Sequence, residues 1–468
     1  MGLHTLTATQ ARLALKRGDF SCVDYIQALL QRSAQHACVN AWVYQDASQL
    51  LKAARSIDQS GRVRKATHRL AGLPFAVKDN IDVADMPAAA GSAALQGRVP
   101  VQSAQIVQQL KAEGAMVAGK AGMHELALGI SGNNAFSGVV RNPYQLKHLA
   151  GGSSSGSAAA VAAGFAPFAL GTETGGSIRI PAALCGLYGL RPSLGRYSRS
   201  GVIPLSKTSD TVGPICRSID DLLLIDSVLA ADESTYSIDF SRLRLGLPRN
   251  TLLSDLAPDV ADIFEHMLDR LSAWGVSFID ADIPLFFALE QQASFPIVFY
   301  ELQRDLPAYL EKTGKRLSLD AIQAGVKSQE VALTLASVLG EGGISEKAYR
   351  KALQLRLRLQ ALCTDYFRQH RLDGFVFPTT VLPAPKIEDS ETVKHNGSVR
   401  STFTLYSRNC NAGSLAGLPA VTMPAGLSQG LPVGVTVSGL WHSDRWLLYL
   451  TKAISAFLDP LEPSLGTF

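Results

Sequence analysis

Two glycine-framed serines and one upstream lysine are the residues of this chain whose types and spacing could do chemistry. Ser153 lies in the glycine- and serine-rich run 151–157, and Ser177 follows two glycines 24 positions later (177 minus 153). Lys78 follows the apolar run 73–77, so it would lie in or beside the core. Burial lowers the pKa of a lysine, and the neutral amine can then accept a proton. This combination favours a serine hydrolase whose base is a lysine rather than a histidine.

The glycines before Ser177 could also create a binding site for a negatively charged oxygen. Glycine permits close approach of the backbone to a ligand. Four consecutive backbone N–H groups are the predicted donors: those of Thr174, Gly175, Gly176 and Ser177. The loss of one donor from such an oxyanion hole typically raises the barrier by about 2.7–4 kcal/mol.

Each of these motifs also has an ordinary structural explanation. A Gly-Gly-Ser run is more often a tight turn, and a serine before an alanine-rich run, such as Ser153, is often a helix N-cap. Lys78 could form an ion pair with Asp79 at a sheet edge. Taken singly, these explanations are the commoner ones, and the joint occurrence of the three residues is what favours catalysis.

A rival hydrolase reading uses a different serine. Residues 152–156 match the Gly-x-Ser-x-Gly elbow of α/β-hydrolases, which would make Ser154 the nucleophile and a histidine its base. That elbow requires a buried strand directly before it, and the segment 142–148 is a poor candidate for one. A Walker-type phosphate loop does not fit, because no Gly-Lys-Ser/Thr follows. The esterase reading therefore stays as an alternative.

The composition is that of a globular protein with a substantial core. Of 468 residues, 47% are hydrophobic and 18% are charged, and the net charge is +4. The densest basic cluster, within 62–69, lacks interleaved aromatic residues, so we expect a solvated loop and no nucleic-acid partner. The six cysteines are dispersed, which argues against disulfides and zinc. We expect no metal and no cofactor.

The segments that could carry targeting or membrane signals do not carry them. The N-terminal residues lack a basic stretch followed by an apolar one, which argues against a signal peptide. The longest run of small apolar residues, 158–170, is interrupted by Gly164 and Pro167. It is shorter than the roughly 20 residues that a membrane span needs. We therefore expect a cytoplasmic protein without membrane association.

Alternating helices and strands are predicted to position the serines and the lysine. Residues 5–60 are predicted to be helical, and the segments that follow alternate between the two types. Strands are predicted at 72–77, 115–118, 165–171, 243–247, 276–279, 375–377, 420–423 and 433–437, and helices at 104–111, 258–274, 345–370 and 446–457. This order predicts the α/β class: a single large three-layer α/β/α domain with a central mixed β-sheet.

Several motifs together closely resemble the amidase signature family. They are Val-Lys-Asp-Asn at 77–80, Gly-Gly-Ser-Ser at 151–154, Gly-Gly-Ser-Ile-Arg at 175–179, and the runs 182–192, 208–214, 411–413 and 417–420. The resemblance spans most of the chain, and this set of motifs is highly specific. It implies an amidase that cleaves linear amide C–N bonds. Within this single domain we expect N-terminal helices (1–65), a catalytic signature core (66–240) and the C-terminal part of the sheet (371–468). The segment 284–343 is helical and poorly patterned, and it could be an inserted cap over the site.

The resemblance assigns a role to each reactive residue. Ser177 is implied to be the nucleophile that forms the acyl-enzyme, and Ser153 the bridging serine that follows a cis peptide bond. Lys78 is implied to be the base at the end of the relay, and the backbone of 174–177 the oxyanion hole. Neutral Lys78 would take the proton of Ser153 as Ser153 takes that of Ser177, and the relay would return it to the leaving amine.

Two positions depart from the family pattern, and two neighbours need interpretation. Glu173 stands where many members carry aspartate, and we expect the longer carboxylate to be tolerated. Ser155 replaces a frequent glycine. We interpret Arg179 as a structural ion-pair partner, with Asp210 as the candidate. His124 is interpreted as a packing residue near the pocket, since no histidine is needed for the relay.

The substrate is predicted from a finer resemblance. The stretches 122–134, 196–213 and 395–413 look most similar to indoleacetamide and mandelamide hydrolases, which cleave arylacetamides to arylacetic acid and ammonia. The candidate substrate-binding residues are Gly129, Ile130, Ser131 and Phe299. The cap segment carries five aromatic residues that could form walls for an aryl group: Phe286, Phe287, Phe295, Phe299 and Tyr300. For most of the five, ordinary core packing is the better explanation.

Other functions remain open at this point. The same chemistry would serve the glutamine-hydrolysing subunit of a tRNA-dependent amidotransferase, which needs partner chains. A catalytically inactive binding protein is disfavoured because all three relay residues are present. We expect a small-molecule amide as the ligand and a homodimer as the candidate assembly.

Overall fold

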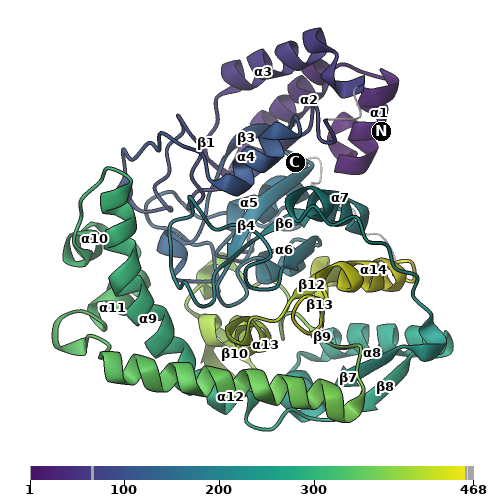
Figure 1. The fold of residues 1–468 in the computed structure, drawn as a ribbon, viewed down its shortest axis with the longest axis vertical. Helices are drawn as coiled ribbons and strands as arrows, with labels where there is room; N and C mark the ends of the chain where they lie inside the picture. The colour runs from purple at the N-terminus through teal and green to yellow at the C-terminus, as the bar shows by residue number, and fades with distance from the viewer. Residues whose placement is uncertain (1, 65–67, 459–460, 462–468) are drawn as a thin grey trace.

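Eleven strands form one mixed sheet in the computed structural model, which describes residues 2–64, 68–458 and 461 (Figure 1). In spatial order they are β1 (Trp42–Tyr44), β3 (Met116–Ala121), β2 (Pro74–Lys78), β4 (Phe168–Glu173), β6 (Thr211–Cys216), β5 (Tyr188–Arg191), β12 (Ala420–Ser428), β13 (Leu431–Ser438), β9 (Gly374–Pro378), β7 (Arg244–Leu247) and β8 (Ser277–Asp280). A separate hairpin consists of β10 (Thr392–His395) and β11 (Ser398–Ser401).

Parallel and antiparallel pairs alternate in blocks across this sheet. β2 is parallel to β3 and β4, and β7 is parallel to β8 and β9. Between these blocks, β4, β6, β5, β12, β13 and β9 pair antiparallel in that order. All five residues of β2 are buried, as expected for a parallel strand covered on both faces.

Helices cover both faces of the sheet, and successive residues of β2 pack against helices on opposite faces. Phe75 and Val77 join a core cluster on the face of α2, α4, α7 and α14, whereas Ala76 joins a cluster with α5 and α6. The helices outside the segment between β8 and β9 are α1 (Ala8–Arg17), α2 (Cys22–Gln35), α3 (Ala47–Ser60), α4 (Gln105–Ala112), α5 (Ser155–Ala162), α6 (Arg179–Leu184), α7 (Ile219–Leu229), α8 (Pro258–Ala273), α13 (Thr402–Ala416) and α14 (Asp444–Ser455). The predicted single three-layer domain with a mixed sheet is confirmed.

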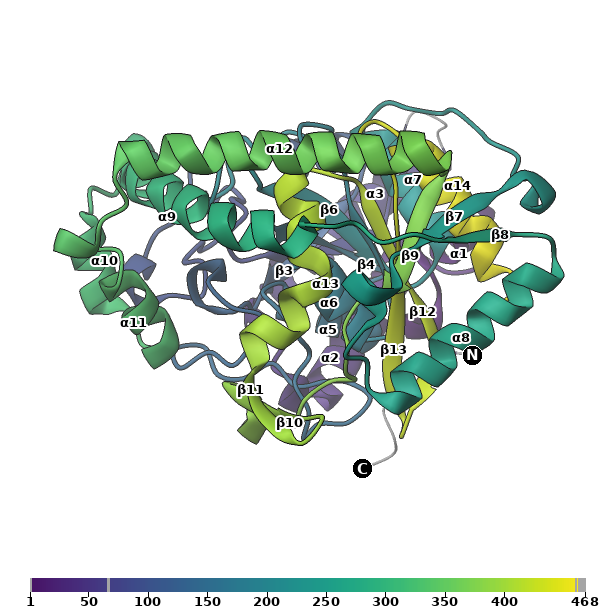
Figure 2. The same ribbon diagram turned by 90° about the horizontal axis from the view of Figure 1, so that it is seen from below.

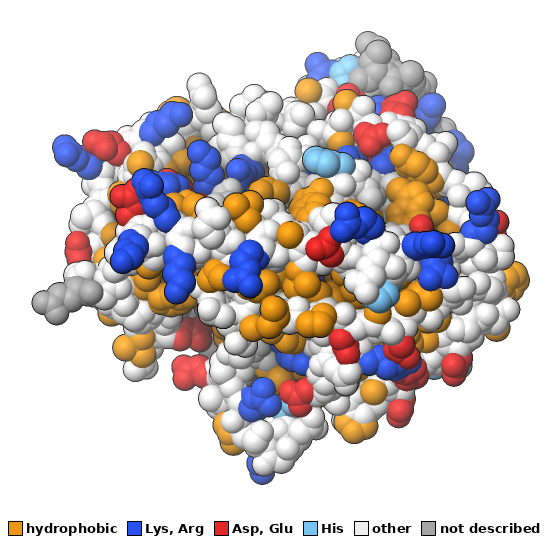
Figure 3. All heavy atoms as spheres, turned by 60° about the horizontal axis from the view of Figure 1, so that its bottom comes forward, with side chains coloured by type: hydrophobic (Ala, Val, Ile, Leu, Met, Phe, Trp, Pro, Cys, Tyr) orange, Lys and Arg blue, Asp and Glu red, His pale blue; other side chains and the backbone are white. Residues whose placement is uncertain are grey.

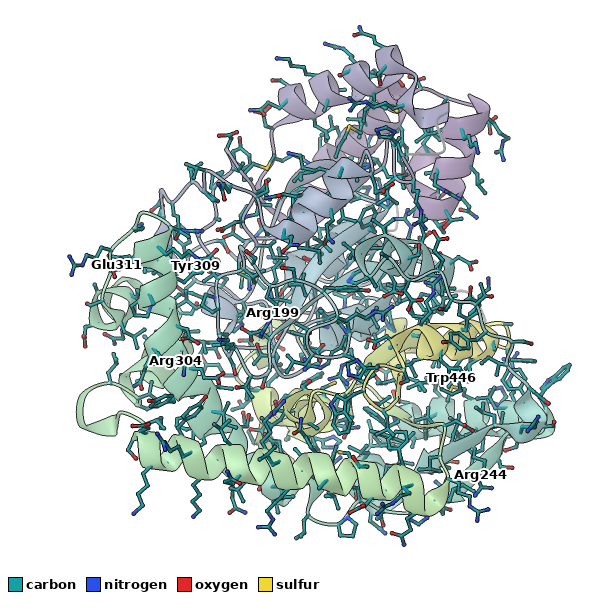
Figure 4. All side chains as sticks on the ribbon, in the orientation of Figure 1. Arg199, Arg244, Arg304, Tyr309, Glu311 and Trp446 are labelled. Atoms are coloured by element: carbon teal, nitrogen blue, oxygen red, sulfur yellow. The ribbon has the colours of Figure 1, made fainter. Side chains whose placement is uncertain are left out.

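Four helices fill the chain between β8 and β9. They are α9 (Phe286–Lys312), α10 (Leu319–Gly325), α11 (Gln329–Ala336) and α12 (Glu346–His370). The long helices α9 and α12 run side by side (Figure 2). Tyr309 of α9 donates a hydrogen bond to Asp82 (2.6 Å), in the loop after β2, and Arg98 lies over its ring (Figure 4). This contact ties α9 to the segment that follows the predicted lysine.

A second contact ties α9 to the loop before β6. The buried carboxylate of Glu301 accepts hydrogen bonds from the Ser206 hydroxyl (2.7 Å), the Thr208 N–H (2.8 Å) and the Tyr349 hydroxyl (2.8 Å). In the same loop, Arg199 donates to the carbonyl oxygen of Asp210 (3.2 Å; Arg199 is labelled in Figure 4). The loop 199–210 is therefore held between α9 and the sheet.

Most strand and helix predictions hold to within a few residues. The strand predicted at 165–171 begins three residues later, as β4, and its end at Glu173 places it against the glycine loop. The elements that were not predicted include the strands β1, β5, β6, β10 and β11 and the helices α6, α7 and α13. The boundary set between 65 and 66 and the end of the last segment at 468 lie outside the described residues. The division into core and cap remains a prediction.

The face that α12 crosses is mixed in character. Lys and Arg side chains are interspersed there with acidic and hydrophobic ones (Figure 3). Lys347, Lys351 and Arg358 of α12 are exposed, and so is Leu357. Across the described ranges, none of the helices combines the length and the apolar character that a membrane crossing requires.

Candidate active site

Lys78 ends β2 with its side chain fully buried (0% exposed). Its Nζ lies 2.8 Å from the Oγ of Ser153, and it also reaches the Oγ1 (2.7 Å) and the carbonyl oxygen (3.2 Å) of Thr172. Thr172 belongs to β4, the neighbouring parallel strand. The sheet register therefore delivers the predicted lysine to the predicted bridging serine.

The surroundings of Lys78 favour the uncharged amine. Burial lowers the pKa of Lys78 well below its usual value of 10.5, while the more distant Asp210 and Glu173 carboxylates act weakly in the opposite direction. The alternative ion pair with Asp79 is wrong, because Asp79 pairs with Lys120 instead (3.3 Å). Among the described residues, the hydrogen bonds of the Lys78 amine thus go to neutral oxygens and to no carboxylate.

Ser153 lies in the loop 151–154, which contacts both His124 and the loop that carries Ser177. The Gly152–Ser153 peptide bond is cis, as the resemblance implies. The Ser153 carbonyl oxygen accepts a hydrogen bond from the His124 N–H (3.1 Å). The next residue, Ser154, donates its N–H to the carbonyl oxygen of Ser177 (3.2 Å). The backbone of the 151–154 run is thereby joined directly to the loop that carries the predicted nucleophile.

Ser177 stands at the end of the glycine loop between β4 and α6. Its side chain is 7% exposed and lines a cavity together with Thr174 and Gly175. Gly176 has a φ of 136°, which L side chains rarely adopt, so glycine is required there. Among the described residues, no acceptor is found for the backbone N–H groups of 174–177, which leaves these donors available to a ligand.

The glycine loop is fixed from both sides by carboxylates, the partly buried Asp210 and the buried Glu173. Thr174 donates its hydroxyl to Asp210 (2.6 Å), whose other oxygen accepts from the N–H groups of Leu205 and Ser206 (both 2.9 Å). Glu173 accepts the N–H groups of Ile178 and Arg179 (both 3.1 Å), just after Ser177. These hydrogen bonds fix the conformation of the loop 174–177 and leave its backbone N–H groups unoccupied.

Arg179 pairs with Glu173, not with Asp210 as predicted. Its Nε and Nη2 donate to one oxygen of Glu173 (2.9 and 2.6 Å), and a second buried arginine, Arg191, lies 3.6 Å from that oxygen. Burial acts to raise the pKa of Glu173, but the two guanidinium groups lower it to about 2. The longer carboxylate therefore serves both arginines and the loop backbone, which explains why glutamate is accommodated here.

Removing the Glu173 charge should destabilise the fold. We expect Glu173→Gln to lower the free energy of unfolding by about 3–5 kcal/mol, because two buried arginines lose their counter-charge. In the native protein the depressed pKa contributes about 3 kcal/mol of stability, complete above pH 4.5 and lost as the pH falls toward 2. Urea titrations from pH 2.5 to 7 test both effects. Glu173→Asp keeps the charge and serves as the control, and equal stability of the glutamine variant at pH 7 would contradict the assignment.

The cavity beside Ser177 has a volume of about 670 Å³. All four residues predicted to bind substrate line it: Gly129, Ile130, Ser131 and Phe299. Of the five cap aromatics, Phe295 and Phe299 line the cavity, whereas Phe286 lies in the core and Tyr300 stacks on Tyr349. Helices α9 and α11 provide one wall, and α13 with the β10–β11 hairpin provides another.

Sequence reasoning missed several cavity residues. Glu290 of α9, Glu330 of α11, and Phe403 and Asn411 of α13 line the cavity without having been predicted. Asn411 belongs to one of the family motifs, 411–413, which was the available signal. Glu290 carries no such signal, since a lone glutamate in a helix usually faces solvent.

Ser154 and His124 lie near the site, and neither is arranged as an esterase mechanism would require. The Ser154 hydroxyl is buried and exchanges hydrogen bonds with the Thr172 carbonyl (3.1 Å) and N–H (3.2 Å). No strand directly precedes it, so the elbow geometry is absent there. His124 is buried at the cavity wall, with its Nε2 2.9 Å from Glu330 and its Nδ1 3.3 Å from the Ser131 hydroxyl. Ser154 is thus held by the backbone rather than presented to the cavity.

Comparison with known proteins agrees with these motifs. The family model described as Amidase matches residues 24–448. An indoleacetamide hydrolase of Agrobacterium vitis is 38% identical over 448 residues, covering 95% of each chain. A mandelamide hydrolase of Pseudomonas putida is 36% identical, covering 97% of this chain and 92% of that protein.

Solved structures share the whole fold. A crystal structure described as an amidase superposes with a TM-score of 0.88 at 31% identity, covering 97% of this chain and 100% of that one. The native peptide amidase of Stenotrophomonas maltophilia gives a TM-score of 0.83 at 29% identity, covering 99% of each chain. The chain therefore belongs to the amidase family and is an amidase.

Proposed function

We propose that this amidase hydrolyses small primary amides of the arylacetamide type, such as indole-3-acetamide, to a carboxylate and ammonia. Ser177 is the nucleophile, Ser153 the bridging serine and Lys78 the base. The observation that carries the proposal is the buried, deprotonation-prone amine of Lys78, 2.8 Å from Ser153 Oγ, beside a cavity lined by Ser177. The hydrolase names of the relatives support the amide as substrate.

In each half of the reaction, the relay transfers a proton from the attacking group toward Lys78 and then returns one to the leaving group. Ser177 Oγ attacks the amide carbonyl carbon while its proton passes to Ser153 and that of Ser153 passes to Lys78. The C–N bond then breaks, and the relay returns the proton so that ammonia leaves. Water attacks the acyl-enzyme ester with the same relay as base, which releases the carboxylate and restores the Ser177 hydroxyl.

The free N–H groups of 174–177 are proposed to hold the developing oxyanion. Their position depends on the bonds from Thr174 to Asp210 and from the Glu173 carboxylate to the start of α6. Because these supports are wholly or partly buried and charged or charge-assisted, the loop is organised before substrate arrives. This is the condition under which electrostatic stabilisation contributes most to catalysis.

The cavity walls support a neutral aryl substrate. The cavity has apolar side chains on both sides of the site: Leu128, Ile130, Leu205, Phe295, Val298 and Phe299. Among the described residues that line it there is no lysine or arginine to receive the α-carboxylate of glutamine. The segment 284–343 is accordingly proposed to act as the cap, since α9 and α11 contribute much of this wall.

A panel of amides tests the substrate class directly. Ammonia release by the chain alone should give a kcat/KM for indole-3-acetamide, phenylacetamide or mandelamide at least about tenfold above that for glutamine or malonamate. The reason is that an aryl group is buried against apolar walls, at about 25 cal/mol per Å² removed from water. Turnover of glutamine alone would overturn the aryl assignment and leave the relay in place. A requirement for added partner chains would favour the amidotransferase subunit.

A further inference from the structure

In the described lining of the cavity, the formally charged side chains are all acidic. Glu290, Glu330 and Glu391 line it, and the described lining includes no lysine or arginine. The substrate and the product of an amidase differ in this respect, because the amide is neutral and the product is a carboxylate. A cavity with this lining treats the two differently.

Of the three carboxylates, Glu290 contacts the side chain that lies against the glycine loop. It lies on α9, is 9% exposed and accepts a hydrogen bond from the side-chain N–H of Asn411 on α13. The Oδ1 of Asn411 is so close to Gly175 that a Cβ there would collide with it. One side chain therefore separates the Glu290 carboxyl from the loop that contains the predicted oxyanion donors.

The other two acidic residues are less suited to act on a bound ligand. Glu330 is 36% exposed at its side chain and lies 2.9 Å from the His124 ring. Glu391 is exposed to solvent. Water screens such charges, whereas a buried charge interacts through a lower effective dielectric constant.

We infer that Glu290 is a specificity-determining residue that excludes anionic acyl groups and promotes release of the carboxylate product. This inference rests on the proposed function, because it concerns the product formed at Ser177. A carboxylate held by the loop 174–177 would face the Glu290 carboxylate across Asn411, and two like charges in a buried site repel each other. A neutral amide in the same position would meet no such repulsion.

The protonation of Glu290 makes the effect dependent on pH. Burial raises the pKa of Glu290 to about 7, although hydrogen bonds with Ser294 and Asn411 oppose this rise. Repulsion should therefore be weak at pH 6 and strong at pH 8.5. Other charged or titratable groups near the site include Lys78 of the proposed relay, His124, Glu330 and Glu391 of the cavity lining, and Glu301, Tyr349, Arg356 and Arg408 on α9, α12 and α13. The test compares variants at the same pH, so that these groups are common to both.

Titration calorimetry with phenylacetate, which is ionised at both pH values, measures the repulsion. The ratio of Kd in the native protein to Kd in Glu290→Gln should be near one at pH 6 and at least about tenfold at pH 8.5. Glu391→Gln, which removes an exposed carboxylate of the same lining, should leave the native value within about twofold at both pH values. An unchanged Kd in Glu290→Gln at pH 8.5, or an equal change in Glu391→Gln, would overturn the inference.

A neutral ligand separates charge from shape. In the Ser177→Ala background, Glu290→Gln should change the Kd of phenylacetamide by less than about twofold. An equal gain for the amide and the carboxylate would mean that the substitution altered packing, and the inference would fail. If aryl amides proved not to be substrates, the malonamide to malonamate ratio of kcat/KM would still test Glu290. That ratio should fall at least about tenfold in Glu290→Gln at pH 8.5, and no fall would overturn the inference independently of the aryl assignment.

Discussion

The Ser177→Ala variant should lose at least about 10⁴-fold in kcat for the best amide of the panel, with its fold intact. The substitution removes the oxygen that forms the acyl bond, and the remaining groups cannot supply a substitute at the same position. Alanine fits the loop without a new contact, since the Ser177 side chain lies at the cavity wall. Ammonia release and thermal unfolding measured on one preparation separate lost chemistry from lost structure.

Ser154→Ala is the matched control for this variant. The Ser154 hydroxyl bonds to the backbone of Thr172, so its removal should lower the free energy of unfolding by about 1–3 kcal/mol. We expect kcat per folded molecule to stay within about tenfold of the native value. The reverse result, an inactive Ser154→Ala and an active Ser177→Ala, would establish the esterase-type alternative in place of the relay.

Lys78→Met should lower kcat by about 10²–10⁴-fold, the usual contribution of a positioned general base. Methionine matches the length of lysine and suits the buried site, so we expect little loss of stability. The partners of the native Nζ are oxygens of Ser153 and Thr172, and no counter-charge is stranded when the amine is removed. Full activity of Lys78→Met would refute the lysine as base.

A second buried lysine offers a matched comparison. Lys120 lies in β3 opposite Val77 and is also 0% exposed, but it pairs with Asp79 (3.3 Å). Lys120→Met should therefore destabilise the fold by about 3–5 kcal/mol, because it strands a buried carboxylate, while kcat per folded molecule is largely retained. Urea denaturation should show the larger loss of stability in Lys120→Met, and ammonia release should show the larger loss of kcat in Lys78→Met. Equal losses of kcat in Lys78→Met and Lys120→Met would contradict the assignment of Lys78 as the base.

The pH profile of the native enzyme follows from the same amine. In the proposed relay the neutral form of Lys78 is the base, and burial lowers its pKa well below 10.5. The kcat/KM should therefore rise with pH along an acidic limb whose midpoint lies well below 10.5. A midpoint near the ordinary lysine value would mean that the amine is solvated and charged in the working enzyme.

The residues of the proposed relay stand out in the sequence because their local sequence is unusual. Glycines frame Ser153 and Ser177, and Lys78 interrupts an apolar strand, so each violates the pattern expected of its element. Asn411 and Glu290 escaped for the opposite reason. Both occupy helices, where a polar residue looks like part of an exposed face until the packing of α9 against α13 is known.

The sheet could be predicted only in part. Long apolar runs such as the one that forms β2 identify strands locally, whereas β5 has four residues and ends in the buried Arg191. α13 has polar residues on its buried side, including Asn409 and Asn411, because it packs on the site, so its apolar periodicity is weak. The order of strands depends on pairings between distant segments, which local patterns do not encode.

The position of the β12–β13 hairpin has a consequence for biosynthesis. β12 pairs with β5 and β13 with β9, so this hairpin joins the two parts of the sheet, and every other strand of that sheet leaves the ribosome before it. Until then the nascent chain carries two partial sheets with bare edges at β5 and β9. Such edges template aggregation, and pairing across long separations is slow. We therefore expect the sheet to be completed only after β12 and β13 have both been synthesised, and we expect shielding of those edges to favour productive folding.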